Sequence, residues 1–171
     1  MKTYPVLVLA AALCAGGCQS SQTAAAPAAP SNVAVNFHDP DNFTDVRDSM
    51  GSGTSQAYLD MISDYLKKTA GQSLSKGQQL TVTFNDIDLA GDIPPGRIDG
   101  VRIIKPIYIP RMSLTFQLKD ASGAVIKEGE RRLTDLDFQS RLALPVDRSD
   151  PLFYDKQLLK DWIRKEFPAN S

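Results

Sequence analysis

Residues 80–89 read LTVTFNDIDL, and their alternation of apolar and polar residues changes phase halfway. The apolar residues from Leu80 to Phe84 share one face of a strand, because successive side chains point to opposite sides of a sheet. Continued in phase, the strand would bury Asp86 and Asp88 and expose the aliphatic residue after each. A slip of one residue reverses every side chain, so we predict a bulge near Asp86. A sheet covered on both faces is the alternative.

The remaining patterns predict one α+β domain, built on a mixed, mainly antiparallel sheet of four to five strands with two helices packed on it. Period-two segments predict strands, and apolar residues at three- and four-residue spacing predict helices. The expected elements are, in order, a strand at 33–37, a helix at 55–70, a strand from 80, an optional edge strand at 101–104, strands at 112–118 and 124–134, and a final helix that starts at Asp150 and Pro151.

The first 18 residues have the features of a signal peptide. The apolar run Val6–Leu13 is shorter than the roughly 20 residues that span a membrane. The small residues Ala15, Gly16 and Gly17 then precede Cys18 and resemble a bacterial lipobox, in which the cysteine is lipidated. Cleavage nearby that releases a soluble exported protein is the alternative. With lipidation, the glutamine after Cys18 favours the outer membrane by resemblance to proteobacterial sorting rules.

Residues 19–31, QSSQTAAAPAAPS, are uncharged and contain two prolines, which is typical of a flexible tether. We expect residues 32–171 to form a single globular domain. Both cysteines, Cys14 and Cys18, precede that domain, so the sequence excludes a disulfide or a thiolate nucleophile inside it.

The overall charge argues against a nucleic-acid partner. With 19 Lys and Arg against 20 Asp and Glu, the net charge is −1. Nucleic-acid binding requires a basic patch or stripe, which this balance does not predict. The single histidine, His38, disfavours histidine-based catalysis or metal binding. We therefore predict no cofactor and no metal.

A group of acidic residues follows the strand that begins at residue 80. Asp86, Asp88 and Gly91 match positions 1, 3 and 6 of a calcium-binding EF-hand loop, and Asp92 could contribute a ligand only in some other geometry. However, an alanine stands at the fifth position and an arginine stands where the loop needs a bidentate glutamate at its twelfth. This departure disfavours a calcium site at these residues.

Two further interpretations of this acidic group remain. Asp86 and Asp88 would lie about 6 to 7 Å apart on one side of a regular strand, a spacing that suits acid–base chemistry. Alternatively, they accept hydrogen bonds from backbone amides or pair with arginines, and so hold a turn. The candidate arginine partners are Arg97, Arg102 and Arg111. The structural interpretation is favoured, because no nucleophile or histidine lies nearby in the sequence.

The segment 105-KPIYIP-110 is expected to be extended but incompletely paired, because its prolines lack a backbone N–H. Ile107, Tyr108 and Ile109 would then form an exposed apolar strip at a sheet edge, which is one kind of partner-binding surface.

Several motifs together resemble a known family. They are 39-DPDNFTD-45, 78-QQLTVTFNDIDLAGD-92, Pro110-Arg111 before a strand, 120-DASG-123 and 154-YDKQLLKDWIRKEF-167. The resemblance is to the proteobacterial exported proteins called domain of unknown function 3016, and it covers residues 33–167. It implies a periplasmic or envelope location, and it implies no catalytic residue or cofactor.

The sequence thus predicts a non-enzymatic cell-envelope lipoprotein. It would be held to the membrane through Cys18 and would bind a protein or cell-wall partner in the periplasm. The alternative is a carboxylate-based hydrolase, or a periplasmic protein that binds a small ligand or divalent metal, using Asp86, Asp88 and Asp92. A hydrolase requires a cleft beside these aspartates and a carboxyl group with a raised pKa.

Overall fold

The computed structural model describes residues 31–47, 53–94, 101–144 and 147–168. The expected signal peptide, the lipidation site Cys18 and nearly all of the tether lie outside these residues. The elements are β1 Val33–Phe37, η1 Pro40–Asn42, α1 Gln56–Ser73, β2 Gln79–Asp88, β3 Arg111–Lys119, β4 Val125–Thr134, η2 Phe138–Ser140, η3 Asp147–Ser149 and α2 Phe153–Glu166.

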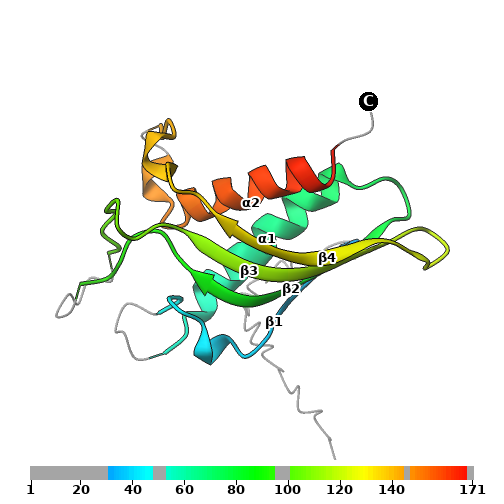
Figure 1. The fold of residues 1–171 in the computed structure, drawn as a ribbon, viewed down its shortest axis with the longest axis horizontal. Helices are drawn as coiled ribbons and strands as arrows, with labels where there is room; N and C mark the ends of the chain where they lie inside the picture. Colours follow the sequence, from blue (N-terminus) through cyan, green and yellow to red (C-terminus); the bar gives the residue numbers. More distant parts are fainter. Residues whose placement is uncertain (1–30, 48–52, 95–100, 145–146, 169–171) are drawn as a thin grey trace, which may run out of the picture.

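The four strands form one mixed sheet in the order β1-β2-β3-β4. β1 runs parallel to β2, and the other two pairs are antiparallel. Both helices lie on the same side of the sheet, with α1 connecting the two parallel strands (Figure 1). The α+β fold predicted from the sequence is therefore confirmed.

The optional fifth strand at residues 101–104 is not formed. Ile103 makes only an isolated bridge, in which its N–H and C=O bond to the main chain of Asp92 at 2.7 and 3.1 Å. Pro106, three residues after Ile103, lacks an N–H and cannot donate a hydrogen bond to a longer ladder.

The change of phase in β2 is a bulge, as predicted. Phe84 pairs with Leu114 of β3 and Asp86 pairs with the preceding residue, Ser113, so one residue of β2 is left over. The bulge turns the following aliphatic residues inward, and Ile87 is fully buried.

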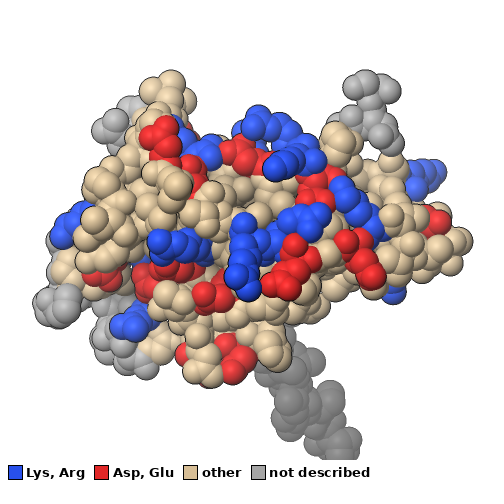
Figure 2. Space-filling view, viewed as in Figure 1, with Lys and Arg blue, Asp and Glu red and all other residues tan. Residues whose placement is uncertain are grey.

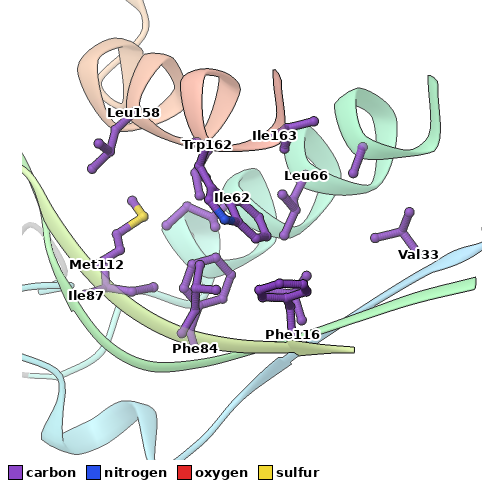
Figure 3. Packing of buried hydrophobic residues seen from close by; sticks show 14 of the residues in the cluster. Val33, Ile62, Leu66, Phe84, Ile87, Met112, Phe116, Leu158, Trp162 and Ile163 are labelled. Atoms are coloured by element: carbon purple, nitrogen blue, oxygen red, sulfur yellow. The ribbon is translucent and has the colours of Figure 1, made fainter. Parts of the chain in front are cut away.

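The core fills the space between the sheet and the helices. Figure 3 shows Phe84 and Phe116 projecting from the sheet toward α1 and α2, with Ile62 and Trp162 among the facing residues. Burying a large apolar side chain contributes about 2 to 3 kcal/mol, so this layer is the main source of stability. No helix in the described part of the chain is long and apolar enough to cross a membrane.

The helix starts were predicted with unequal success. The helix predicted from residue 55 begins at Gln56, with Ser55 as its N-cap, and the Ser55 hydroxyl accepts a hydrogen bond from the N–H of Tyr58. The prediction that α2 begins at Asp150 and Pro151 was wrong by two residues. Asp150 instead accepts from the N–H of Leu152 at 3.0 Å within a turn, and the helix begins at the next residue.

The strand β4 is an edge of the sheet, and it carries many charged residues, which protect an edge against pairing with another chain. Figure 2 shows basic and acidic side chains interspersed across this face of the molecule. On the core side of β4, Arg131 and Lys127 bind the carboxylate of Glu166 at the end of α2, each at 2.8 Å. This contact ties the last helical turn to the edge strand.

Candidate functional site

Asp86 holds the chain segment that follows η1. One of its carboxylate oxygens accepts from the N–H of Thr44 at 2.7 Å, and the other accepts from the Thr44 hydroxyl at 2.9 Å. A carboxylate used in this way organises a loop.

Asp88 forms an ion pair with Arg111 at 3.0 Å, across the pairing of β2 with β3. Burial raises the pKa of the Asp88 carboxyl, and the hydrogen bond and charge of Arg111 oppose that rise. Arg111 was one of the three arginines expected to bind these aspartates. Arg97, another of them, lies outside the described residues.

Gly91 and Asp92 form a tight turn after β2. Gly91 has a φ of 78°, and a Cβ atom there would lie 2.7 Å from the carbonyl oxygen of Ile103. Only glycine fits, because the left-handed conformation and the close approach both exclude a side chain. The turn therefore presses directly against residues 101–104.

Arg102, the third candidate partner, does not bind Asp86 or Asp88. Its side chain is only 2 % exposed and lies against the turn at residues 89–91. It donates to the carbonyls of Ala90 at 3.1 Å, Gly91 at 2.8 Å and Leu89 at 3.3 Å, and to Asp45 at 2.5 Å. Its Nη1 atom has no hydrogen-bond partner among the described residues.

Asp155 is a buried acid that the sequence analysis missed. It lies in the first turn of α2 and is fully buried. Its Oδ1 accepts from the N–H of Ala90 at 3.0 Å, and its Oδ2 has no partner in the described part of the chain. Burial raises the pKa of Asp155 to about 7, against the opposing hydrogen bond from Ala90 and the charge of Arg102.

One signal could have revealed Asp155. It stands seven residues before Trp162, and both belong to the apolar stripe of α2. An acidic residue on the buried face of a helix is unusual unless it has a specific partner.

A cavity of about 710 Å³ lies beside this buried pair, at one end of the sheet. It opens between residues 101–104, residues 139–143 and the start of α2. Its lining residues are Tyr58, Val101, Arg102, Ile104, Gln139, Ser140, Arg141, Leu142, Ala143, Asp147, Ser149, Asp150, Pro151, Phe153 and Tyr154. Asp86, Asp88 and Asp92 do not line it, so the cleft that a hydrolase would need beside them is not this one.

Two apolar residues that line the cavity are exposed to solvent. Leu142 is 85 % exposed and Val101 is 52 % exposed. Leu136, which precedes the cavity residues 139–143 in the sequence, is also 79 % exposed. Exposed apolar side chains gathered around a hollow are typical of binding surfaces.

The segment proposed as a partner-binding edge has a different geometry. Residues 105–108 form a turn, closed by the N–H of Tyr108 and the carbonyl of Lys105. Ile107 is strongly exposed, whereas Tyr108 and Ile109 are half-buried. The carbonyl of Tyr108 accepts from the N–H of Gly91, so this backbone is used to hold the turn after β2.

A metal site would need several side chains that can act as ligands close to one another. In the described residues, no three His, Asp or Glu side chains come together in a way that could hold a metal ion.

The fold and the site define a class of protein: an α+β domain with both helices on one side of its sheet. Its cavity is lined by the buried Arg102 and by Phe153 and Tyr154, which precede the buried Asp155 in α2. Residues 31–165 match the family described as "Protein of unknown function (DUF3016)". The chain belongs to this family, and the resemblance found in its motifs is confirmed. A comparison with curated proteins finds no match.

Proposed function

We propose that this protein is a non-enzymatic lipoprotein of the bacterial cell envelope that binds a protein partner in its terminal cavity. The leader with its lipobox-like residues before Cys18 supports the lipid anchor, and the outer membrane is the proposed site of attachment. The uncharged tether would hold the domain in the periplasm.

The observation that carries this proposal is the position of the cavity relative to the tether. Val33, next to the tether, pairs with Leu80 at the start of β2. The cavity lies beyond the other end of β2, where Arg102 binds the turn at 89–91. β2 has ten residues and therefore spans about 33 Å. A domain held at residue 31 would therefore present the cavity at its far end; Figure 1 shows β1 and β2 running between the two ends.

The polar side chains of the cavity favour binding over chemistry. Arg141 pairs with Asp135 and Asp161, and Asp150 pairs with Lys156. These groups already satisfy one another. The surface left for contact with a partner is mainly apolar and aromatic, from residues such as Tyr154. Such a surface suits an apolar side chain inserted by the partner.

Affinity capture with matched variants tests the proposal. The full-length protein is recovered from native envelope membranes as wild type, as Leu142→Asp and as Ile126→Asp. Ile126 is also exposed, at 49 %, but it lies at the start of β4, away from the cavity. We expect Leu142→Asp to reduce partner recovery at least about tenfold, since a buried charge in an interface costs more than about 1.4 kcal/mol.

Ile126→Asp should retain the same partners as the wild type. Equal recovery by all three proteins, or equal loss in both variants, would contradict the proposal. Mass spectrometry of the mature N-terminus tests the anchor separately: a lipidated Cys18 is expected, and an unmodified N-terminus at another residue would indicate a soluble exported protein.

A further inference from the structure

The two walls of the cavity are joined through a single residue, Ala90, which bonds to one wall through its N–H and to the other through its carbonyl. The N–H of Ala90 bonds to Asp155 of α2, and the carbonyl of Ala90 bonds to Nε of Arg102. Arg102 and Ile104 belong to one wall, and the first turn of α2 forms another through Phe153. A change in either hydrogen bond would therefore move residues that line the cavity.

Asp155 and Arg102 each have one side-chain polar atom that makes no hydrogen bond to the described residues. Oδ2 of Asp155 and Nη1 of Arg102 are both buried without a hydrogen-bond partner among the described residues. A buried carboxylate with one hydrogen bond for two oxygens is costly, so this geometry favours the neutral acid. The charge of Arg102 is already matched by Asp45.

We propose that Asp155 and Arg102 form a proton-controlled latch that sets the shape of the cavity; this regulation rests on the proposed function of the cavity. With Asp155 protonated, Arg102 stays on Asp45 and on the carbonyls of residues 89–91, as observed. When Asp155 releases its proton to water, its Oδ2 becomes an anion that attracts the unused Nη1. Arg102 then shifts toward Asp155 and moves residues 101–104.

The surrounding charges support this mechanism. The charged side chains that act on Asp155 are Arg102, which favours its anion, and Asp45, which disfavours it. Lys156 and Asp150, its neighbours in sequence, pair with each other. The pKa of about 7 for Asp155 places the change within the range that an envelope protein can meet.

A fluorescent reporter at the cavity mouth tests the latch. The full-length chain contains only Cys14 and Cys18, so their replacement by serine allows one reporter cysteine, Leu142→Cys. A polarity-sensitive label at this position should report one transition between about pH 5 and pH 9, with its midpoint at about 7. The Asp155→Asn variant should show no transition.

Asp45→Asn provides a second variant with an expected direction. It frees Arg102 and removes a negative charge near Asp155, so the midpoint should fall by about one pH unit. A reporter at Ile126→Cys should show no transition. His38→Gln, which removes the only histidine of the chain, should leave the transition of the Leu142 reporter unchanged. Urea unfolding checks that each variant is folded.

The outcomes separate this inference from the proposed function. A transition that survives in folded Asp155→Asn, or that does not move in folded Asp45→Asn, overturns the latch even if a partner binds. A transition that behaves as expected supports the latch even if no partner is captured. Partner affinity that differs at least threefold between pH 6 and pH 8 in the wild type, and not in Asp155→Asn, would show that the latch regulates binding; equal affinities would overturn that regulation.

Discussion

Gly91 shows how one residue positions the cavity wall. Its left-handed backbone lets residues 89–91 turn sharply, so that their carbonyls converge on Arg102. The same turn brings Gly91 against Ile103, with no room for a side chain between them. The arginine site thus depends on a residue that has no side chain.

We expect Gly91→Ala to destabilise the protein by about 2 kcal/mol or more, because a methyl group would strain the backbone and overlap the carbonyl of Ile103. Gly123→Ala is the matched control. Gly123 also has a positive φ, of 87°, but a Cβ atom there meets nothing within 4 Å. Its cost should be about 1 kcal/mol. Urea unfolding measures both, and equal losses would contradict the packing argument.

Asp155 should make stability depend on pH in the opposite direction from most acids. Its folded pKa of about 7 lies above the unfolded value of about 4, so its stabilising contribution is complete below pH 4 and is lost as pH rises through 7. The loss is on the order of a few kcal/mol. Asp155→Asn should remove this slope between about pH 4 and 7, as measured by urea unfolding at several pH values. A wild-type curve that is flat over this window would be evidence against a neutral Asp155.

At the scale of elements, β4 and α2 are held together by charge as well as by apolar packing. Glu166 lies between Lys127 and Arg131, while the Arg131 guanidinium stacks over the ring of Phe116 at 5.0 Å. Hydrogen bonds from Arg131, and then from Lys127, lower the pKa of Glu166 to about 2. The end of α2 is thereby fixed to an edge strand that would otherwise face solvent on both sides.

Glu166→Gln should cost about 1 to 2 kcal/mol at neutral pH, because two cations would lose a partly buried partner. In the wild type, the contribution of Glu166 is present above its unfolded pKa of about 4.5 and is lost as pH falls toward 2. The control is Glu130→Gln, which breaks an exposed contact of 3.8 Å with Arg132 and should change the free energy of unfolding by less than about 0.5 kcal/mol. Equal effects of the two substitutions would show that burial at Glu166 adds nothing.

The strands were predictable from sequence because their side chains alternate locally, and even the bulge followed from the phase change before Asp86. The residues of the cavity were not predictable in this way. Arg102 was expected to bind a nearby aspartate, but its partners lie on turns and loops that only the folded chain brings together. Asp155 was missed because it lies on a face of α2 that is otherwise apolar. The periodicity of a helix identifies its buried face, but it does not show which groups a polar residue on that face will contact.

At the scale of the whole molecule, the tether end, the core and the cavity are arranged in this order along the direction of β2. The tether joins at the start of β1, the apolar core occupies the middle, and the cavity lies beyond the other end of β2. The edge once expected at 105–110 is instead a turn that supports the cavity end. In the proposed function, partner binding at this end would leave the proposed lipid anchor at the opposite end undisturbed.

The helical layer has a consequence for how the chain is made. Trp162 and Ile163 of α2 complete a core whose other walls come from segments synthesised much earlier. Until α2 emerges, the sheet and α1 expose apolar side chains such as Phe116 to water. A shortened chain that lacks this helix should therefore remain open and prone to aggregation, because the core is complete only when α2 has docked.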